Sequence, residues 1–305
     1  MQLKNATSYF PVSGDIDANL AHVHRQMRQA AQEGCDVIHF PECGLSGYAG
    51  VDFESYKGFD WSRLEEATRE VLDEARRLGL WTLLGSSHRL SARHKPHNSV
   101  YVVNRRGRVV DRYDKLFCAG PRSGRGGDLR HYTPGSHFCE FRINRIRCGI
   151  LICHDCRYPE LYREYRRRRV QLMFHSFHAG NVPARLWKAI AAEIGPRNVR
   201  LNGAETIPGI VFPATMQSMA ANNFMWISCS NSSRAQSCFP GFFVRPDGVI
   251  TGRLRRNVAG ILVSTVDTAQ EVYDSTVAWR DRAMDGVFHS GETVRDARSG
   301  DRTRV

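Results

Sequence analysis

The sequence predicts an α/β protein in which helices cover β-sheets. Short apolar runs typical of buried strands alternate with segments whose apolar residues have helical spacing, in both halves of the chain. Pairs of strands joined by short turns interrupt this alternation. With 305 residues and 42% hydrophobic content, the chain can form one large domain or two ordinary ones. No change in composition marks an interior boundary, and the sequence has no repeat of fixed period.

The first half of the chain contains two amphipathic segments that end at glycines. Asn19 to Glu33 has helical spacing and stops at Gly34. A second helix is expected to start with the capping box Ser62-Arg63-Leu64-Glu65 and to end at Gly79. Strands are expected at 36–40 and 80–85, followed by a hairpin of strands at 98–103 and 108–113. The glycine- and arginine-rich stretch 116–135 reads as a long loop, and such loops are often functional.

The second half repeats the alternation and ends in a polar segment. Strands are expected at 138–143, 146–152, 170–177, 224–229, 242–245, 249–253 and 258–266. Helices are expected from Pro159 and over Val211 to Asn223, and a short one around Leu186 to Glu193 within an irregular stretch. We expect residues 1–285 to form the domain, and residues 286–305 to form a tail that is loose or docked on a partner subunit.

The charge and the cysteine content give an expectation about nucleic-acid binding and about the cellular compartment. The formal net charge is +12, mostly from arginine, and the densest run is Arg166 to Arg169. We interpret this run as a solvated helix end, because cations suit a helix C-terminus and no nucleic-acid-binding motif accompanies it. Nine cysteines, an odd number without an evident signal peptide, indicate free thiols and a cytoplasmic location. No apolar run is long enough to span a membrane.

The segment from Arg147 to Tyr165 carries the strongest chemical signal. An apolar strand stops at Cys153, and a helix is expected to begin at Pro159. A thiol at this junction lies near free backbone N–H groups and the positive end of a helix dipole. A thiol placed there can have a lowered pKa, and the thiolate is the nucleophile, although free cysteines are also commonly buried structural residues.

Two other polar residues also follow apolar strands. Glu42 comes after the strand at 36–40, and Lys115 comes after the second strand of the hairpin. Strand ends at one edge of an α/β sheet commonly converge on a site. Together with Cys153, these residues would supply a nucleophile, an acid–base group and a cation for acyl transfer. Each of them taken alone has an ordinary structural explanation.

The residues around these positions resemble the three signatures of the nitrilase, or carbon–nitrogen hydrolase, superfamily. The signatures are Phe40-Pro41-Glu42 with Gly44 to Tyr48, then Tyr113-Asp114-Lys115, then Cys153 to Glu160. The resemblance extends from about residue 3 to about residue 270. It implies a four-layer α-β-β-α sandwich that forms a homodimer or higher oligomer by packing helices. It also implies hydrolysis of a small-molecule substrate without a metal or organic cofactor.

The resemblance assigns a role to each of the three residues. Cys153 would be the nucleophile, and Glu42 would be the general base and later the acid for the leaving amine. Lys115 would stabilise the oxyanion together with the backbone N–H of His154. Members of the family often have a second glutamate seven residues before the glycine of a Pro-Gly pair. In this chain Asp128 stands there, and the shorter carboxylate leaves open whether it orients Lys115.

The residues after the nucleophile favour one kind of substrate. Nitrilases commonly have Trp-Glu after the cysteine, whereas this chain has His154-Asp155. The continuation from Arg157 to Glu160 resembles the amidase and N-carbamoyl-hydrolase branches, so we expect an amide or carbamoyl C–N bond rather than a nitrile. By their position next to the signatures, the candidate substrate-binding residues are Tyr48, His154, Arg157, Tyr158, His175 and Phe177. Arg157 could instead form a structural ion pair.

Other classes of function remain open. Cys153 and Cys156 form a C-x-x-C pair, which can be a redox dithiol or half of a zinc site, but no second ligand pair has suitable spacing. A catalytically silent member of the family is also possible, as is nucleic-acid binding through the basic charge. The intact set of Glu42, Lys115 and Cys153 favours the enzyme.

Overall fold

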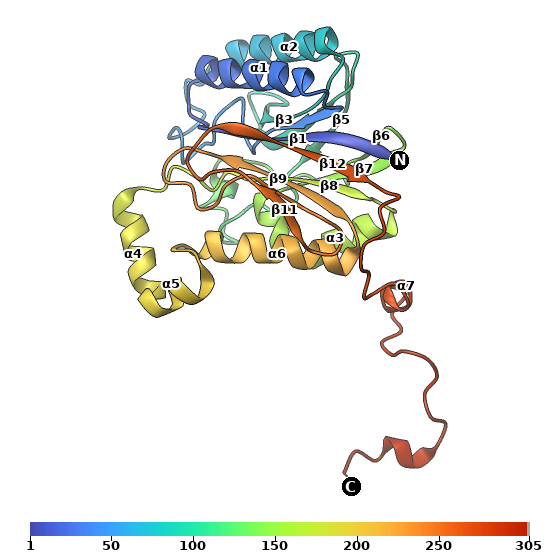
Figure 1. The fold of residues 1–305 in the computed structure, drawn as a ribbon. Helices are drawn as coiled ribbons and strands as arrows, with labels where there is room; N and C mark the ends of the chain where they lie inside the picture. Colours follow the sequence, from blue (N-terminus) through green and yellow to red (C-terminus); the bar gives the residue numbers. More distant parts are fainter. Residues whose placement is uncertain (304–305) are drawn as a thin grey trace.

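Two halves of a twelve-stranded β-sheet lie between layers of helices in the computed structural model, which describes residues 1–303 (Figure 1). The first half contains β1 (Gln2–Phe10), β2 (Val37–His39), β3 (Trp81–His88), β4 (His97–Val103), β5 (Val109–Asp114) and β12 (Gly260–Asp267). The second contains β6 (Glu140–Ile143), β7 (Ile146–Ile152), β8 (Leu172–Ser176), β9 (Trp226–Ser232), β10 (Phe242–Val244) and β11 (Ile250–Arg253).

The strand order is β5-β4-β3-β2-β1-β9-β8-β7-β6, and β12 lies beside β1. The two halves join where the last residues of β1 pair in parallel with the end of β9, Tyr9 with Asn231 and Phe10 with Ser232. Within the first half β1, β2 and β3 are parallel, and within the second β7, β8 and β9 are parallel. Parallel strands therefore deliver their carboxyl ends to a common edge in each half.

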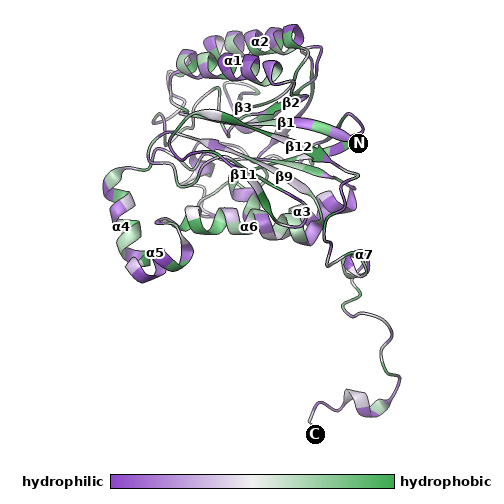
Figure 2. Ribbon diagram, in the orientation of Figure 1, coloured by the Kyte–Doolittle hydropathy of each residue, from purple (hydrophilic) through white to green (hydrophobic). Residues whose placement is uncertain are grey.

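Four helices form the outer layers (Figure 1). α1 (Ile16–Gln32) and α2 (Trp61–Leu78) pack on the first half, and α3 (Pro159–Arg167) and α6 (Ile207–Asn223) cover the second. Apolar residues of both halves meet between the sheets, and the outer helices carry hydrophilic bands (Figure 2). The predicted four-layer α-β-β-α sandwich is confirmed.

A polar residue links the two halves inside the core. His39 of β2 contacts the hydroxyl of Ser228 on β9 and that of Ser176 on β8, each at 2.9 Å. Burial lowers the pKa of His39 to about 3, so the imidazole is neutral at physiological pH. A neutral imidazole has one donor and one acceptor nitrogen, so both contacts can be hydrogen bonds, and they link β2 to β8 and β9 across the core.

Two local predictions differ from the structure. The N-cap of α2 is Asp60, whose carboxylate accepts from the backbone N–H of Arg63 at 2.9 Å, and not the predicted Ser62. The helix starts one residue before Ser62, which places that serine inside the first turn. In the stretch expected to be irregular, the short helix predicted around Leu186 to Glu193 is confirmed as α4 (Ala184–Ile194), but a second helix, α5 (Pro196–Asn202), was not predicted; both project from the body of the molecule (Figure 1).

The C-terminal segment leaves the sandwich after β12. A short helix, α7 (Arg280–Met284), is followed by a chain that extends away from the body (Figure 1). The predicted tail at 286–305 includes residues 304–305, which lie outside the described residues, and its boundary remains a prediction. None of the helices within residues 1–303 combines the length and the apolar character needed to cross a membrane.

Gly85 in β3 allows the loop before Glu42 to lie against the sheet. A Cβ atom at this glycine would stand 1.9 Å from the carbonyl oxygen of Pro41. We expect Gly85→Ala to lower the free energy of unfolding by about 1–3 kcal/mol, because the backbone has to shift. Urea denaturation would measure the change. Gly260→Ala in β12, where the nearest atom is 3.7 Å away, is the control, and equal effects of the two substitutions would contradict this packing argument.

Candidate active site

Three strand ends bring Glu42, Lys115 and Cys153 together. Glu42 follows β2, Lys115 follows β5 and Cys153 follows β7. The ammonium of Lys115 donates to Glu42 Oε1 at 2.8 Å and to Oδ2 of Asp128 at 2.7 Å. The thiol is close enough to Glu42, Lys115 and Asp128 for all three charges to affect its pKa. The structure thus gathers the four residues that the sequence singled out as catalytic.

The two oxygens of the Glu42 carboxylate have different surroundings. Oε1 accepts from Lys115 and from the side-chain amide of Asn98, the latter at 2.7 Å. Oε2 is buried and has no hydrogen-bond partner within residues 1–303. The backbone carbonyl of Asn98 also accepts from the N–H of Lys115 at 2.9 Å. Asn98 therefore positions the glutamate and the lysine at once, and leaves one carboxylate oxygen available for chemistry.

Lys115 is a fully buried cation between two carboxylates. Burial by itself lowers the pKa of this ammonium, but Glu42, Cys153 and Asp128 outweigh it and hold the pKa of Lys115 well above its usual value. Burial raises the pKa of Asp128, but Lys115 outweighs it and the net pKa is below the usual value. Both groups are therefore charged at physiological pH. An ammonium has three donors, and two of them are used here.

Asp128 reaches Lys115 because its loop closes on itself. The N–H of Asp128 donates to the carbonyl of Ala119 at 2.7 Å, and the N–H of Ala119 donates to Asp128 Oδ2 at 2.8 Å. A Cβ on Gly127 would lie 2.4 Å from the carbonyl oxygen of Ala119 and 2.7 Å from the Cα of Gly120. Gly127 also has a φ of 60°, which suits glycine. These glycines let the two strands of the loop approach closely.

Cys153 begins a short 3₁₀ turn, Cys153–Arg157, directly after β7. Its φ of 44° is in the left-handed region, which is uncommon for a non-glycine residue and frequent at functional sites. The lowered pKa that a position at a helix start can give to a thiol does not occur here. Burial and the negative charge of Glu42 raise the pKa of the thiol well above its usual value, and Lys115 only partly opposes them. The resting thiol is therefore protonated and needs a base.

Asp155 ties the turn that carries Cys153 to the strand that carries Lys115. Its carboxylate accepts from the hydroxyl of Tyr113 at 2.7 Å, from the N–H of Phe117 at 2.8 Å and from the N–H of Ile152 at 3.0 Å. Burial raises the pKa of Asp155 to about 6 in spite of these three donors. The bonds cross-link residues on both sides of the nucleophile and of the lysine.

The predicted substrate-binding residues have different environments. Tyr48 donates its hydroxyl to Asp128 Oδ1, and its ring lies 5.8 Å from the ammonium of Lys115. His154 is partly buried, and Tyr158 stacks on Phe117 with ring centroids 3.7 Å apart. Arg157 is exposed, and its guanidinium lies over the ring of Phe212, 4.9 Å from the ring centroid. Within residues 1–303 it does not form the ion pair that we considered as an alternative.

His175 and Phe177 are buried behind the nucleophile. Nδ1 of His175 lies 2.7 Å from the hydroxyl of Tyr162, and Nε2 lies 3.2 Å from the carbonyl oxygen of Cys153. Phe177 stacks on His175, and its carbonyl accepts from the N–H of Glu42 at 3.3 Å. Both residues contact backbone atoms of the catalytic candidates, and their predicted contact with substrate remains a prediction.

A family model for carbon–nitrogen hydrolases matches residues 2–273. The chain belongs to the carbon–nitrogen hydrolase family. It is 26% identical over 163 residues to nitrilase homolog 2 from Dictyostelium discoideum, covering 52% of this chain and 49% of that protein. It is also 26% identical over 170 residues to an ω-amidase from Xenopus tropicalis, covering 54% of this chain and 60% of the relative. The chain thus spans about half the length of the curated relatives it matches.

Solved structures share the fold of this chain at low sequence identity. An amidase from Nesterenkonia sp. superposes with a TM-score of 0.67 at 18% identity, covering 87% of this chain and 90% of the amidase. A glutamine-dependent NAD+ synthetase from Acinetobacter baumannii superposes with a TM-score of 0.66 at 17% identity, covering 88% of this chain and 46% of the synthetase. The family and the fold predicted from the three signatures are confirmed.

Sequence reasoning missed a second buried ionic pair beside the site. Nε2 of His178 lies 2.8 Å from Oδ2 of Asp52, and both side chains are fully buried. Burial lowers the pKa of His178, but Asp52 outweighs it and the net pKa is above the usual value. The other contact of Asp52 Oδ2 is the N–H of Tyr48 at 3.0 Å, and the Tyr48 ring packs on His178. No local pattern pairs residues so far apart in the chain.

The alternative sites for metal or redox chemistry gain no support from the geometry. All nine cysteines, including Cys153 and Cys156, are free thiols. Among residues 1–303, no group of three or more His, Cys, Asp or Glu side chains is arranged to hold a metal ion. The second ligand pair that a zinc reading of the C-x-x-C motif requires is therefore missing from the part of the chain that the structure describes.

The raised pKa of Cys153 predicts a distinctive alkylation profile. The thiolate is the reacting form, so the rate of iodoacetamide labelling at Cys153 should still be rising above pH 9, the usual thiol value. Glu42→Gln removes a negative charge and should move the midpoint to lower pH. Lys115→Met removes a positive charge and should move it to higher pH. Peptide mass spectrometry measures the rates, and a midpoint below pH 8 in the unsubstituted protein would contradict this description.

Proposed function

We propose that this chain hydrolyses a non-peptide C–N bond, in an amide or N-carbamoyl substrate, through a thioester on Cys153. The observation that carries the proposal is the pairing of a protonated thiol with a carboxylate whose Oε2 is buried and unpartnered. A neutral thiol is a weak nucleophile, and a base next to it removes this limit at the moment of attack. Glu42 is that base.

The reaction proceeds in two halves with balanced proton transfers. The Cys153 proton moves to Glu42 Oε2 while Sγ bonds to the carbonyl carbon. The C–N bond then breaks, Glu42 returns the proton to the leaving nitrogen, and ammonia or an amine departs. Water next gives a proton to Glu42 and adds its oxygen to the thioester carbon. The C–S bond breaks, the sulfur regains the proton, and the carboxylic acid leaves.

Lys115 stabilises the oxyanion in both halves. Two of its three donors hold Glu42 and Asp128, and the third is free to point at developing negative charge. The backbone N–H of His154, in the turn that begins at Cys153, is the second donor. Because Lys115 is buried and already held, it does not have to reorganise when the charge appears.

Asp128 replaces the usual second glutamate as the residue that positions Lys115. Its Oδ2 binds the ammonium and its Oδ1 accepts from Tyr48, so every oxygen of this shorter carboxylate has a partner. The closed loop at Ala119 makes up for the missing methylene. Asp128 therefore acts through Lys115 rather than on the substrate.

The relatives favour an amide over a nitrile. Two of the proteins that match this chain are named as amidases, the ω-amidase and the Nesterenkonia enzyme. The pocket residues that we propose for the acyl group are Tyr48, His154, Arg157 and Tyr158, which lie on or beside the turns that carry Glu42 and Cys153, with His175 and Phe177 behind them. Assembly as a homo-oligomer and a domain that ends near residue 285 remain predictions.

Intact-protein mass spectrometry tests the covalent step. The protein and its Cys153→Ala variant are mixed with primary amides, N-carbamoyl amino acids and nitriles. We expect an acyl adduct on the unsubstituted protein only, which discharges with release of ammonia or amine, and the mass names the acyl group. An adduct that persists on Cys153→Ala would exclude Cys153 as the nucleophile. No adduct and no ammonia from any compound would favour a catalytically silent member of the family.

Two substitutions separate the roles of the lysine and the aspartate. Lys115→Ala removes an oxyanion donor and should lower kcat by roughly 10²–10³-fold, or about 2.7–4 kcal/mol. Asp128→Asn keeps the size and removes only the charge, so kcat should fall by roughly tenfold or more, about 1.4 kcal/mol, with KM little changed. Steady-state kinetics on the substrate found above measures both. A larger loss for Asp128→Asn than for Lys115→Ala would contradict an indirect role.

A further inference from the structure

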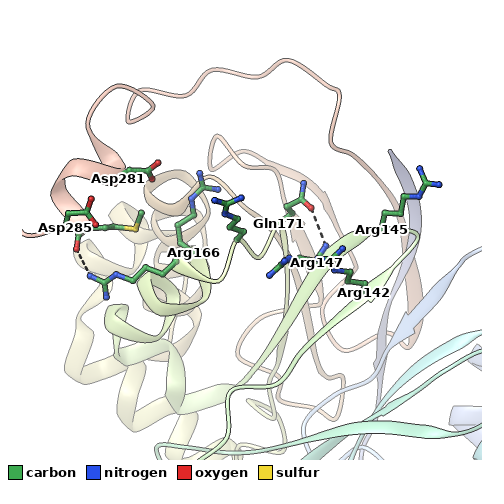
Figure 3. Close-up of a pocket in the computed structure, with 10 residues that line it drawn as sticks. Arg142, Arg145, Arg147, Arg166, Gln171, Asp281 and Asp285 are labelled. Atoms are coloured by element: carbon green, nitrogen blue, oxygen red, sulfur yellow. Dashed lines mark hydrogen bonds between the residues drawn. The ribbon is translucent and has the colours of Figure 1, made fainter.

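Away from the catalytic candidates, arginines line an open cavity of about 670 Å³ (Figure 3). It lies where the β6–β7 hairpin, the end of α3 and α7 come together. Its lining consists of Arg142, Arg145, Arg147, Arg166, Arg167, Arg169, Gln171, Asp281, Met284 and Asp285. The six guanidinium groups face only two carboxylates in this lining, a surplus of four positive charges. Such a concentration of cations is unfavourable unless something compensates it.

Several of these guanidinium groups have no partner in the protein. Within residues 1–303, the side chains of Arg142, Arg145 and Arg169 form no hydrogen bond and no ion pair. By contrast, Arg147 donates to the carbonyl of Arg168 at 3.0 Å, and Arg167 donates to the carbonyl of Met284 at 2.6 Å. The paired arginines connect segments of the protein that line the cavity, whereas the N–H donors of the unpaired arginines are available to a ligand.

Two of the unpaired arginines stand at backbone positions that favour glycine. Arg145 in the β6–β7 turn has a φ of 70°, and Arg169 after α3 has a φ of 60°. A non-glycine residue in this region costs about 1–2 kcal/mol. Glycine at both positions would be more stable locally, so arginine there is more easily explained by what its side chain does than by the fold.

The neighbouring acidic groups compensate the arginines only in part. Burial and the guanidinium of Arg280 lower the pKa of Arg166, while Asp281 partly opposes them. Glu140 lies 3.8 Å from Arg147, and Glu164 lies 3.9 Å from Arg167, at the margins of ion-pair distance. None of these two glutamates and two aspartates forms an ion pair with Arg142, Arg145 or Arg169 within residues 1–303.

We propose that this cavity is a binding site for a small anion that carries two or more phosphate groups. Guanidinium groups bind phosphate oxygens through two parallel hydrogen bonds, and several of them together suit a multivalent anion. The volume is in the range of small-molecule sites. The lining contains no aromatic side chain on which a base could stack, so the phosphate groups, rather than a nucleobase or a single nucleic-acid strand, are what the site recognises.

The site is separate from the catalytic residues. Arg147 lies near the start of β7 and Cys153 follows its end, six residues later, so the two are roughly 20 Å apart along the strand. A ligand in the arginine-lined cavity cannot reach the thiol. The inference therefore does not depend on the proposed hydrolase activity.

Calorimetric titration of the full chain with inorganic tripolyphosphate tests the proposal at about 150 mM salt. We expect saturable binding of one anion per chain and a higher unfolding temperature in its presence. The double variant Arg145→Gly/Arg169→Gly should bind at least tenfold more weakly and remain folded, because glycine suits both backbone positions. If it does not fold, Arg142→Gln in the exposed part of β6 gives the same comparison.

The matched control removes the same number of charges elsewhere. Arg185→Ala/Arg197→Ala changes two exposed arginines on α4 and α5 and should alter the affinity less than twofold. Equal weakening by both double variants would mean diffuse electrostatic attraction and would overturn the proposal. So would the absence of saturable tripolyphosphate binding, or binding of duplex DNA only. A change in sedimentation of the glycine variant without tripolyphosphate binding would instead assign the cavity to contacts between copies of the chain.

Discussion

The buried ammonium of Lys115 is the interaction on which the site depends. A charge in the core is tolerated only when opposite charges and hydrogen bonds surround it, and Glu42 and Asp128 supply both. Removing either carboxylate would leave a buried charge poorly compensated. The arrangement also divides the oxygens of Glu42, because Oε1 is held by Lys115 and Asn98 while Oε2 has no partner within residues 1–303. Glu42 thus both compensates the charge of Lys115 through Oε1 and keeps Oε2 free to act as a base.

The thiol illustrates how tertiary surroundings override a local rule. A cysteine at the start of a helical turn is expected to be a stabilised thiolate, yet burial and the charge of Glu42 make the thiol of Cys153 harder to ionise. A neutral thiol beside a carboxylate carries less charge into a buried site than a thiolate beside a carboxylate would. Burial and the nearby Glu42 carboxylate therefore keep the Cys153 thiol protonated, and proton transfer from the thiol to Glu42 becomes part of the attack.

Positive charge is distributed unevenly over the molecule. Near the catalytic candidates, the lysine is matched by carboxylates at hydrogen-bond distance. At the other end of β7, six arginines line one cavity and three of them have no partner within the described residues. The net charge of +12 thus includes two different kinds of cation: Lys115, which carboxylates compensate inside the fold, and the cavity arginines, several of which have no partner. A solvated helix end explains Arg166 and Arg167 but not Arg145, which comes from a hairpin turn.

The sequence by itself determined most elements and the strand ends that carry the catalytic candidates, but it did not predict β1, α5 or α7. Strand and helix periodicity placed Glu42, Lys115 and Cys153 after apolar strands, and three ordered signatures identified the family, because both are local properties of the chain. Only the tertiary structure decided how the ends meet. The use of Asn98 to hold both Glu42 and Lys115, the pairing of His178 with Asp52 and the raised pKa of Cys153 depend on distances between residues far apart in sequence. The arginine-lined cavity also depends on the tertiary structure, because its lining comes from the β6–β7 hairpin, the end of α3 and α7, which are far apart in the sequence.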